Sequence, residues 1–200
     1  MENEFLQSLA VLPCSVLNRE LRPFSAWHAS ALMMFDSPFL RGAGAEVTRD
    51  DLVFATFVCT TTYPTGMSEL YPKPDIEKFY TWGDEVGPWD FEEELYKLDS
   101  VYLKHYLSFP KMWEDAKTQP RETAVPWPFY VVSVVLQHST GIIENDAWNM
   151  PISRLGAHKA SIAEAHGAIL LSERQKMLLA FKDKIEKDAV AEKEVESCQT

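Results

Sequence analysis

Five histidines are the side chains of this 200-residue sequence best suited to bind a metal ion or to transfer protons near neutral pH. None belongs to an HExxH motif, and none is paired with a cysteine at the spacing of a zinc site. His158 and His166 fall on one expected helix, but eight residues separate them, whereas histidine ligands of one ion usually stand four apart on a helix. The sequence therefore predicts no metal site. The five are His28, His105, His138, His158 and His166.

Motifs for nucleophilic catalysis and for phosphate binding are also absent from the sequence. There is no GxSxG nucleophile elbow, and neither Cys14 nor Cys59 has a histidine beside it. Cys59 lies within an apolar run, which favours a small buried side chain over a reactive thiol. The stretch Arg41 to Ala45 has two glycines but lacks the lysine and the third glycine of a phosphate-binding loop. We expect no catalytic residues and no cofactor.

Acidic residues are concentrated between Asp84 and Asp99, where seven acids accompany one base, Lys97. Glu92, Glu93 and Glu94 occupy the expected first turn of a helix, where the helix dipole favours negative charge. A solvated helix start is the interpretation that we prefer. The same carboxylates could instead dock a basic partner, so Glu92, Glu93 and Glu94 are candidate partner-binding residues. A hydrolase would need two of these carboxylates with different pKa values.

Three of the six tryptophans are further candidates for partner binding. Trp113, Trp127 and Trp148 lie next to expected loops or prolines, where large side chains often line grooves. Tryptophan is enriched at the centres of protein interfaces. The other tryptophans are expected in the core.

Composition narrows the classes of protein further. Hydrophobic residues make up 46% of the chain, which is enough for a substantial core. The net charge of −11 argues against binding nucleic acid or an anionic membrane. The first four residues, Met-Glu-Asn-Glu, include two acids and no base, whereas a signal peptide begins with basic residues. The longest apolar run, Phe129 to Leu136, is too short to span a membrane. Three unpaired cysteines fit a reduced compartment, so we expect a soluble cytoplasmic protein.

The elements that must position these side chains are expected to be helices. Apolar residues between Phe91 and Phe109 recur at intervals of three and four, which is the clearest helical pattern. Capping signals mark other helix starts at Ser25, Thr48, Ser153 and Ser172. The expected helices are 26–35, 52–60, a short one around 75–82, 91–109, 129–138, 153–165 and one from 172. A strand is the alternative for 52–60, and 129–138 is a buried helix or a buried strand.

The predicted fold is mainly α, an irregular multi-helix bundle with a loop segment rich in proline and aromatic residues at 61–90. We expect one helical domain over 1–182 and a charged tail over 183–200 that frays.

Two patches of the sequence, about 21–60 and 124–167, resemble a known group of proteins. The first contains Leu-Arg-Pro-Phe-Ser from Leu21 and Ser-Pro-Phe-Leu from Ser37, and the second contains Val-Pro-Trp from Val125 and Ala-Trp-Asn-Met-Pro from Ala147. They look like small helical proteins encoded near the tape-measure gene of tailed bacteriophages, some of which are tail assembly chaperones. The resemblance implies a non-enzymatic protein of the host cytoplasm. Such a protein binds the long helical tape-measure protein during tail assembly and leaves before the virion matures.

Two other hypotheses remain open at this point. The chain could be a structural component of the virion, such as a connector or tail-associated subunit, which would form a homo-oligomer. It could also be an enzyme of a rare helical class that uses the 84–99 acidic cluster and a histidine.

Overall fold

A computed structural model describes residues 9–41, 44–70, 81–82, 85, 87–107, 114–115, 125–168, 170–171, 177 and 181, and every structural statement below concerns these residues. The protein is mainly helical, which confirms the predicted fold class. The helices are α2 (Ala26–Met34), η1 (Pro38–Leu40), α3 (Arg49–Thr60), α4 (Thr65–Leu70), α6 (Phe91–Tyr96), η2 (Lys97–Leu103), α7 (Lys104–Leu107), α8 (Trp127–His138), α9 (Glu144–Asn149) and α10 (Ile152–Ala165). Two short antiparallel pairs join β1 (Ser15–Val16) to β2 (Arg19–Glu20), and β3 (Glu114–Asp115) to β4 (Leu170–Leu171).

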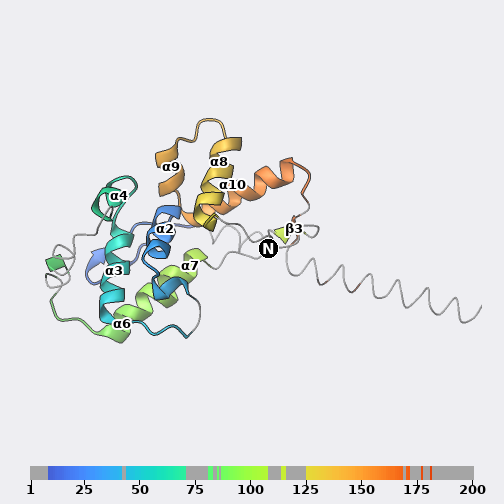
Figure 1. Ribbon diagram of the computed structural model, residues 1–200. Helices are drawn as coiled ribbons and strands as arrows, with labels where there is room; N and C mark the ends of the chain where they lie inside the picture. Colours follow the sequence, from blue (N-terminus) through green and yellow to red (C-terminus); the bar gives the residue numbers. More distant parts are fainter. Residues whose placement is uncertain are drawn as a thin grey trace, which may run out of the picture.

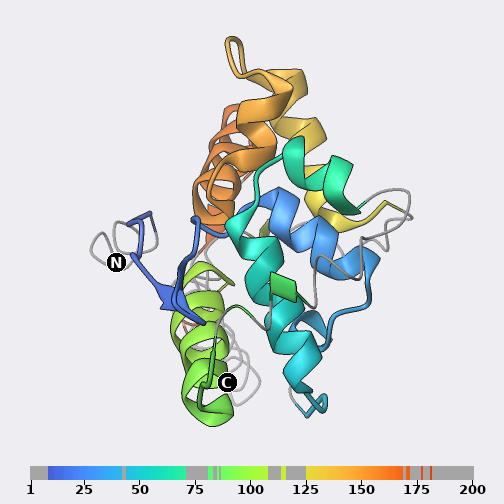
Figure 2. The same cartoon turned by 90° about the vertical axis from the view of Figure 1, so that its left-hand side faces the viewer.

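Helix α2 is the centre of the fold. It contacts α3, α8 and α9, and its residues from Ala26 to Leu32 are all buried. Four of these seven residues are alanine or serine, whose small side chains let neighbouring helices approach closely. Figure 1 shows α8, α9 and α10 at one end of the molecule, with α3 and α6 at the other. In Figure 2, α3 runs beside α2.

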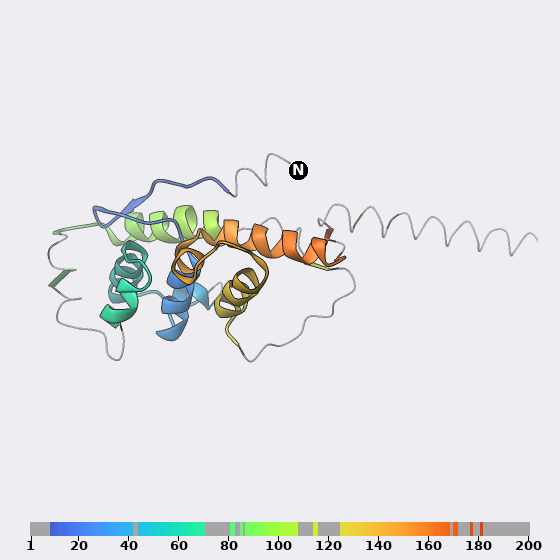
Figure 3. The ribbon, with the colours of Figure 1, turned by 90° about the horizontal axis from the view of Figure 1, so that it is seen from above.

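The helix that begins at Phe91 continues without a break to Leu107, as its apolar pattern predicts. Its middle, η2, is a π-helical segment, so α6, η2 and α7 form one rod. Leu98, Tyr102 and Tyr106 are buried along one side of this rod. Seen from above in Figure 3, the rod and α10 lie in one row, with α2, α3 and α8 beneath it. Contacts of α3 with α6 and of α10 with α8 join the two layers, and α10 contacts α7 within the row.

Two helix starts follow the predicted capping signals. Thr48 caps α3, because its Oγ1 accepts from the Asp51 amide at 3.2 Å while the Asp51 carboxylate accepts from the Thr48 amide at 2.9 Å. This reciprocal box settles the 52–60 alternative in favour of a helix, which begins at Arg49. Ser25 is the N-cap residue of α2, and its amide donates to Nδ1 of His28 at 3.1 Å.

Several expectations about local structure were wrong. Ser153 does not cap α10, because Pro151 holds the N-cap position and the Ser153 hydroxyl is buried without a hydrogen-bond partner among the described residues. Helix α4 lies in the segment expected to be irregular, and α9 was not predicted. Both are short helices, which a sequence pattern resolves poorly because one turn shows little periodicity.

The hairpin at the N-terminal side of the described chain was not predicted either. Leu17 and Asn18 form its two-residue turn, with φ angles of 51° and 54°. Such turns usually contain glycine or asparagine, so leucine in the first position hides the signal. The Leu17 side chain is buried, and its amide donates to Glu94 Oε2 at 2.6 Å. A buried carboxylate therefore attaches the hairpin to α6.

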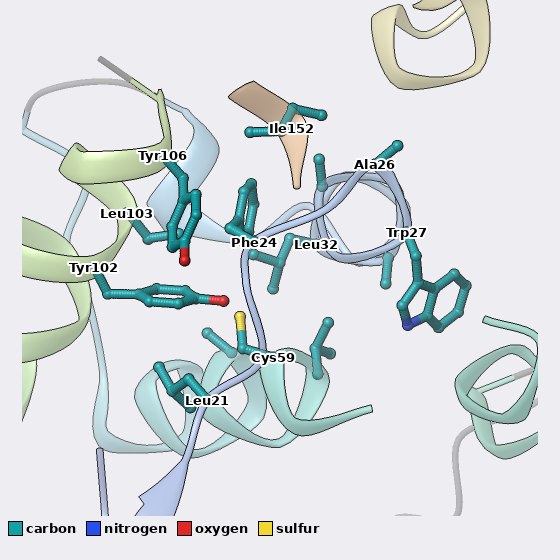
Figure 4. Packing of buried hydrophobic residues seen from close by; sticks show 14 of the residues in the cluster. Leu21, Phe24, Ala26, Trp27, Leu32, Cys59, Tyr102, Leu103, Tyr106 and Ile152 are labelled. Carbon is teal, nitrogen blue, oxygen red and sulfur yellow. The ribbon is translucent and has the colours of Figure 1, made fainter. Parts of the chain in front are cut away.

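The centre of the core lies between the rod, α2 and α3. Figure 4 shows Phe24 among Tyr102, Tyr106 and Ile152, with the sulfur of Cys59 directed towards Tyr102. The ring of Phe24 meets that of Tyr102 edge-on, with centroids 6.0 Å apart. The Tyr102 hydroxyl donates to the Arg22 carbonyl at 2.5 Å, so this buried hydroxyl is satisfied.

Three expectations lie wholly or mostly outside the described residues. They are the charged tail at 183–200, the helix from Ser172, and the short helix around 75–82, of which Thr81 and Trp82 are described and helical.

Candidate functional site

The structure separates the three candidate tryptophans. Trp127, the first residue of α8, is 39% exposed. Trp148 in α9 is 7% exposed and belongs to the core. Trp113 lies outside the described residues. Trp127 is therefore the candidate tryptophan whose ring the structure places at the surface.

Trp127 belongs to an aromatic surface at the start of α8. The side chains of Trp127, Phe129 and Tyr130 are 39%, 39% and 42% exposed, and we call these three residues the α8 aromatic surface. Val125, immediately before the helix, is 50% exposed. At 100° per residue, the three rings fan across less than half of the helix circumference. Exposed aromatic rings that share one face mark a surface for an apolar partner.

The local sequence explains why these rings are held outwards. Pro126 is at the N-cap position and Pro128 lies within the first turn, where a missing amide hydrogen costs nothing and the ring fixes φ. The opposite side of α8 is buried through Pro128, Val131, Val132 and Val135. Helix α8 contacts α2, α9 and α10, so three helices fix its orientation. The expectation that 129–138 is a buried segment was wrong at its exposed residues, which are Phe129, Tyr130, Ser133, Gln137 and His138.

Trp148 supports the α8 aromatic surface from beneath. Its ring lies edge-on to Phe129, with centroids 4.8 Å apart, and 5.5 Å from the ring of Tyr63. The side chain of Asn149 then fixes Tyr63, because its Oδ1 accepts from the Tyr63 amide at 2.9 Å and its Nδ2 donates to the Tyr63 carbonyl at 2.7 Å. The Ala-Trp-Asn-Met-Pro stretch therefore acts as a packing element that holds Phe129 in place.

Two charged residues flank the α8 aromatic surface. Lys159 of α10 places its Nζ 5.0 Å from the centroid of the Tyr130 ring. Burial lowers the pKa of Lys159 below its ordinary value. Near Phe129, Glu144 Oε1 accepts hydrogen bonds from the Tyr63 hydroxyl at 3.2 Å and from Trp148 Nε1 at 3.4 Å. Helix α8 itself contains no Asp, Glu, Lys or Arg.

The three candidate glutamates divide between two environments. Glu92 and Glu93 are exposed in the first turn of α6, which Asp90 caps by accepting from the Glu93 amide at 2.8 Å. Glu94 is buried, and besides the Leu17 amide it binds Lys97 Nζ at 2.7 Å. Lys97 Nζ is also 2.7 Å from Glu93 Oε1. These carboxylates lie at the end of the molecule away from α8 (Figure 1).

The buried histidine and cysteine take part in structural contacts. His28 Nδ1 accepts from the Ser25 amide, and its Nε2 donates to the Thr61 carbonyl at 3.0 Å, which defines the neutral tautomer with the proton on Nε2. Burial is the largest cause that lowers the pKa of His28, to about 4. Burial also raises the pKa of Cys59 to about 12, so its thiol stays protonated at neutral pH.

Other histidines approach each other at the ends of α8 and α10. The rings of His138 and His166 are 5.0 Å apart between centroids and meet edge-on. His166 thus contacts a histidine of another helix. Within the described ranges, no three His, Cys, Asp or Glu side chains gather as a group that could hold a metal ion.

The sequence did not identify Phe129, Tyr130 or Lys159 as site residues. A signal was present, because Trp127 and Tyr130 are three residues apart and therefore share one side of a helix. The continuous apolar run from Phe129 concealed it.

Comparisons with known proteins add no relative. No protein-family model, curated protein or solved structure matches this chain. Of the helices that the structure describes, none has the length and apolar character needed to cross a membrane.

Proposed function

We propose that this protein is a non-enzymatic tail assembly chaperone of a tailed bacteriophage, which binds the tape-measure protein in the host cytoplasm. The sequence resemblance supports the family, and the α8 aromatic surface supplies the partner-binding site. In this proposal the exposed rings bind the apolar face of a helix from the tape-measure protein, which is a long helical protein.

The observation that carries the proposal is the combination of exposed rings and a rigid support. Trp127, Phe129 and Tyr130 are well exposed, yet α8 is packed against three other helices and Phe129 rests on Trp148. Aromatic rings held in this way contribute binding energy at a small cost in conformational entropy. Tryptophan and tyrosine are also the residue types most enriched at the energetic centres of interfaces.

The side chains that could take part in catalysis are engaged in structural contacts, which is compatible with a binding role. Both ring nitrogens of His28 are engaged with backbone groups, and the Cys59 thiol is protonated and buried. The acidic residues Glu93 and Glu94 share Lys97 in the first turns of α6. Each of these groups therefore has a structural task in the fold.

Co-purification from bacteria tests the proposal. The tagged full-length chain is co-expressed with the tape-measure protein encoded in the same gene cluster, and the amount recovered on the affinity resin is measured. We expect recovery with the wild type and at least a tenfold loss with the double substitution Trp127→Ala and Tyr130→Ala. Recovery of the tape-measure protein in equal amounts with and without these rings would remove the α8 aromatic surface from the proposal. Failure to recover it with the wild type would overturn the chaperone function.

A matched control is available on the rod. Tyr96 is 63% exposed in α6, which lies at the end of the molecule away from α8 (Figure 1), so Tyr96→Ala removes an exposed ring of similar size elsewhere. It should leave recovery unchanged. Circular dichroism of each variant shows whether the helices are retained.

A further inference from the structure

Lys159 and Lys97 differ in the groups that surround their ammonium groups. Lys97 lies 2.7 Å from both Glu93 and Glu94. Among the described residues, no carboxylate lies within ion-pair distance of Lys159, whose Nζ lies over the face of the Tyr130 ring. The cation is also partly buried, which lowers its pKa. A partly desolvated cation without a counter-ion can gain favourable energy from a carboxylate supplied by another molecule.

Glu144, the negatively charged residue on the other flank, already has hydrogen-bond partners. Glu144 is already hydrogen-bonded by the hydroxyl of Tyr63 and by the indole of Trp148. The two flanks of the α8 aromatic surface are therefore not equivalent. On one flank the charge is satisfied within the fold, and on the other the charge faces an aromatic ring.

The intervening surface constrains what a partner can present. Trp127, Phe129 and Tyr130 offer rings, and α8 has no charged side chain. A partner must therefore bring apolar side chains to α8 and can satisfy Lys159 only from the edge of the contact. An amphipathic helix has this arrangement, because its apolar stripe is bordered by polar positions three and four residues away.

We infer that the partner is an amphipathic helix that carries an aspartate or glutamate at the border of its apolar stripe, and that this carboxylate pairs with Lys159. The inference rests on the proposed function, because it specifies the chemistry of the partner at the same surface. The carboxylate fixes the direction in which the helix lies across α8, since Lys159 is found beside Tyr130 and Glu144 beside Trp148.

An anionic membrane would also supply apolar contact and negative charge. The net charge of −11 disfavours that partner, because the whole chain is repelled by an anionic surface while one lysine attracts it. A single carboxylate on a helix brings much less repulsion. The protein helix is therefore the partner that the charges favour.

Two synthetic peptides test the inference. Both are 18-residue amphipathic helices with the same leucine stripe, and they differ only in whether the positions bordering one side of the stripe are Glu or Gln. Fluorescence anisotropy gives the Kd of each labelled peptide for the full-length protein at physiological salt. We expect the Glu peptide to bind about 2- to 5-fold more tightly than the Gln peptide, which is the range of a partly exposed ion pair.

Variants of the protein assign that preference to Lys159. Lys159→Gln should make the two peptides bind equally, Lys159→Arg should retain the preference, and Lys104→Gln, which removes an exposed lysine of α7, should leave it unchanged. Trp127→Ala should weaken both peptides by the same factor. Equal binding of the two peptides to the wild type, or a preference that persists in Lys159→Gln, would overturn the inference.

Two other outcomes also contradict it. Binding to phosphatidylglycerol vesicles that Trp127→Ala abolishes would assign the surface to a membrane. Absence of detectable binding by both peptides would likewise reject a helix-binding surface of this chemistry. The co-purification experiment reports separately on the proposed function, because recovery of the tape-measure protein does not depend on which residue borders its apolar stripe.

Discussion

The carboxylate of Glu94 accepts a hydrogen bond from the backbone amide of Leu17, 77 positions earlier in the chain, at 2.6 Å. Leu17 occupies the turn of the N-terminal hairpin with a positive φ, and its side chain is buried. The same carboxylate binds Lys97 at 2.7 Å. Glu94 therefore connects the hairpin to the rod.

Removal of this carboxylate should destabilise the fold. In Glu94→Ala the Leu17 amide loses its acceptor in a buried position, which costs about 1–3 kcal/mol in the free energy of unfolding. Glu94→Gln retains a carbonyl oxygen that can accept, so its cost should be smaller. Urea denaturation of each variant measures the difference.

Glu92→Ala serves as the control, because Glu92 is exposed in the same turn. Its loss removes a favourable interaction with the helix dipole of about 0.3–1 kcal/mol. Equal destabilisation by Glu92→Ala and Glu94→Ala would show that the Leu17 contact contributes nothing beyond the charge of the helix start.

The acidic cluster illustrates what the sequence could and could not predict. Clustered acids at a helix start correctly indicated α6, because the preference of a helix N-terminus for negative charge is local. The burial of Glu94 depends on Leu17, which is distant in sequence and lies in a turn without glycine. A contact between residues so far apart leaves no periodic pattern in the sequence from which it could be predicted.

The same distinction applies to the α8 aromatic surface. The apolar run indicated an element from Phe129, whereas α8 begins two residues earlier, at Trp127. Which side of that element faces water depends on α9 and α10, which pack against it after a turn at Gly141. Because every residue from Phe129 to Leu136 is apolar except Ser133, the run gives only a weak indication of its exposed side.

Trp148→Ala should lower the free energy of unfolding by about 3–5 kcal/mol. The indole is almost completely buried, and its ring contacts Phe129 and Tyr63. Its removal leaves a cavity between α8 and α9. The midpoint of urea denaturation provides the measurement.

Trp127→Ala is the matched control for this substitution, because the same side chain is removed from an exposed position. It should change stability by less than about 1 kcal/mol. If the two variants were equally stable, Trp148 would not be the packing element that the structure indicates.

Gly66→Ala should destabilise the protein although alanine is the better helix former. A methyl group built on Gly66 would lie 2.6 Å from the indole of Trp27 and 2.6 Å from Oγ1 of Thr61. These two groups are themselves joined, because Trp27 Nε1 donates to Thr61 Oγ1 at 3.0 Å. The clash should cost about 1–3 kcal/mol, in excess of the gain in helix propensity.

Ser68→Ala in the same short helix is the comparison. Ser68 is exposed, so this substitution should stay within about 0.5 kcal/mol of the wild type. Thermal melting of both variants distinguishes the effects. A higher melting temperature for Gly66→Ala would mean that α4 does not pack closely against Trp27.

The last prediction concerns the pH dependence of stability through His28. Its pKa is lowered to about 4 in the folded protein, against 6.5 for an exposed histidine, chiefly because burial disfavours the charged ring. Between pH 6.5 and 4 the unfolded chain therefore binds more protons at this residue than the folded protein does.

The contribution of His28 to stability is complete above pH 6.5 and falls as the pH decreases towards 4, by about 3 kcal/mol in total. Protonation would also remove the acceptor that Nδ1 offers to the Ser25 amide. Other groups titrate in the same range, so the measurement is the difference in unfolding free energy between wild type and His28→Gln from pH 7.5 to pH 4. That difference should shrink as the pH falls, because the glutamine variant lacks the titrating ring. A difference that stays constant across this range would show that His28 is accessible to protons in the folded state.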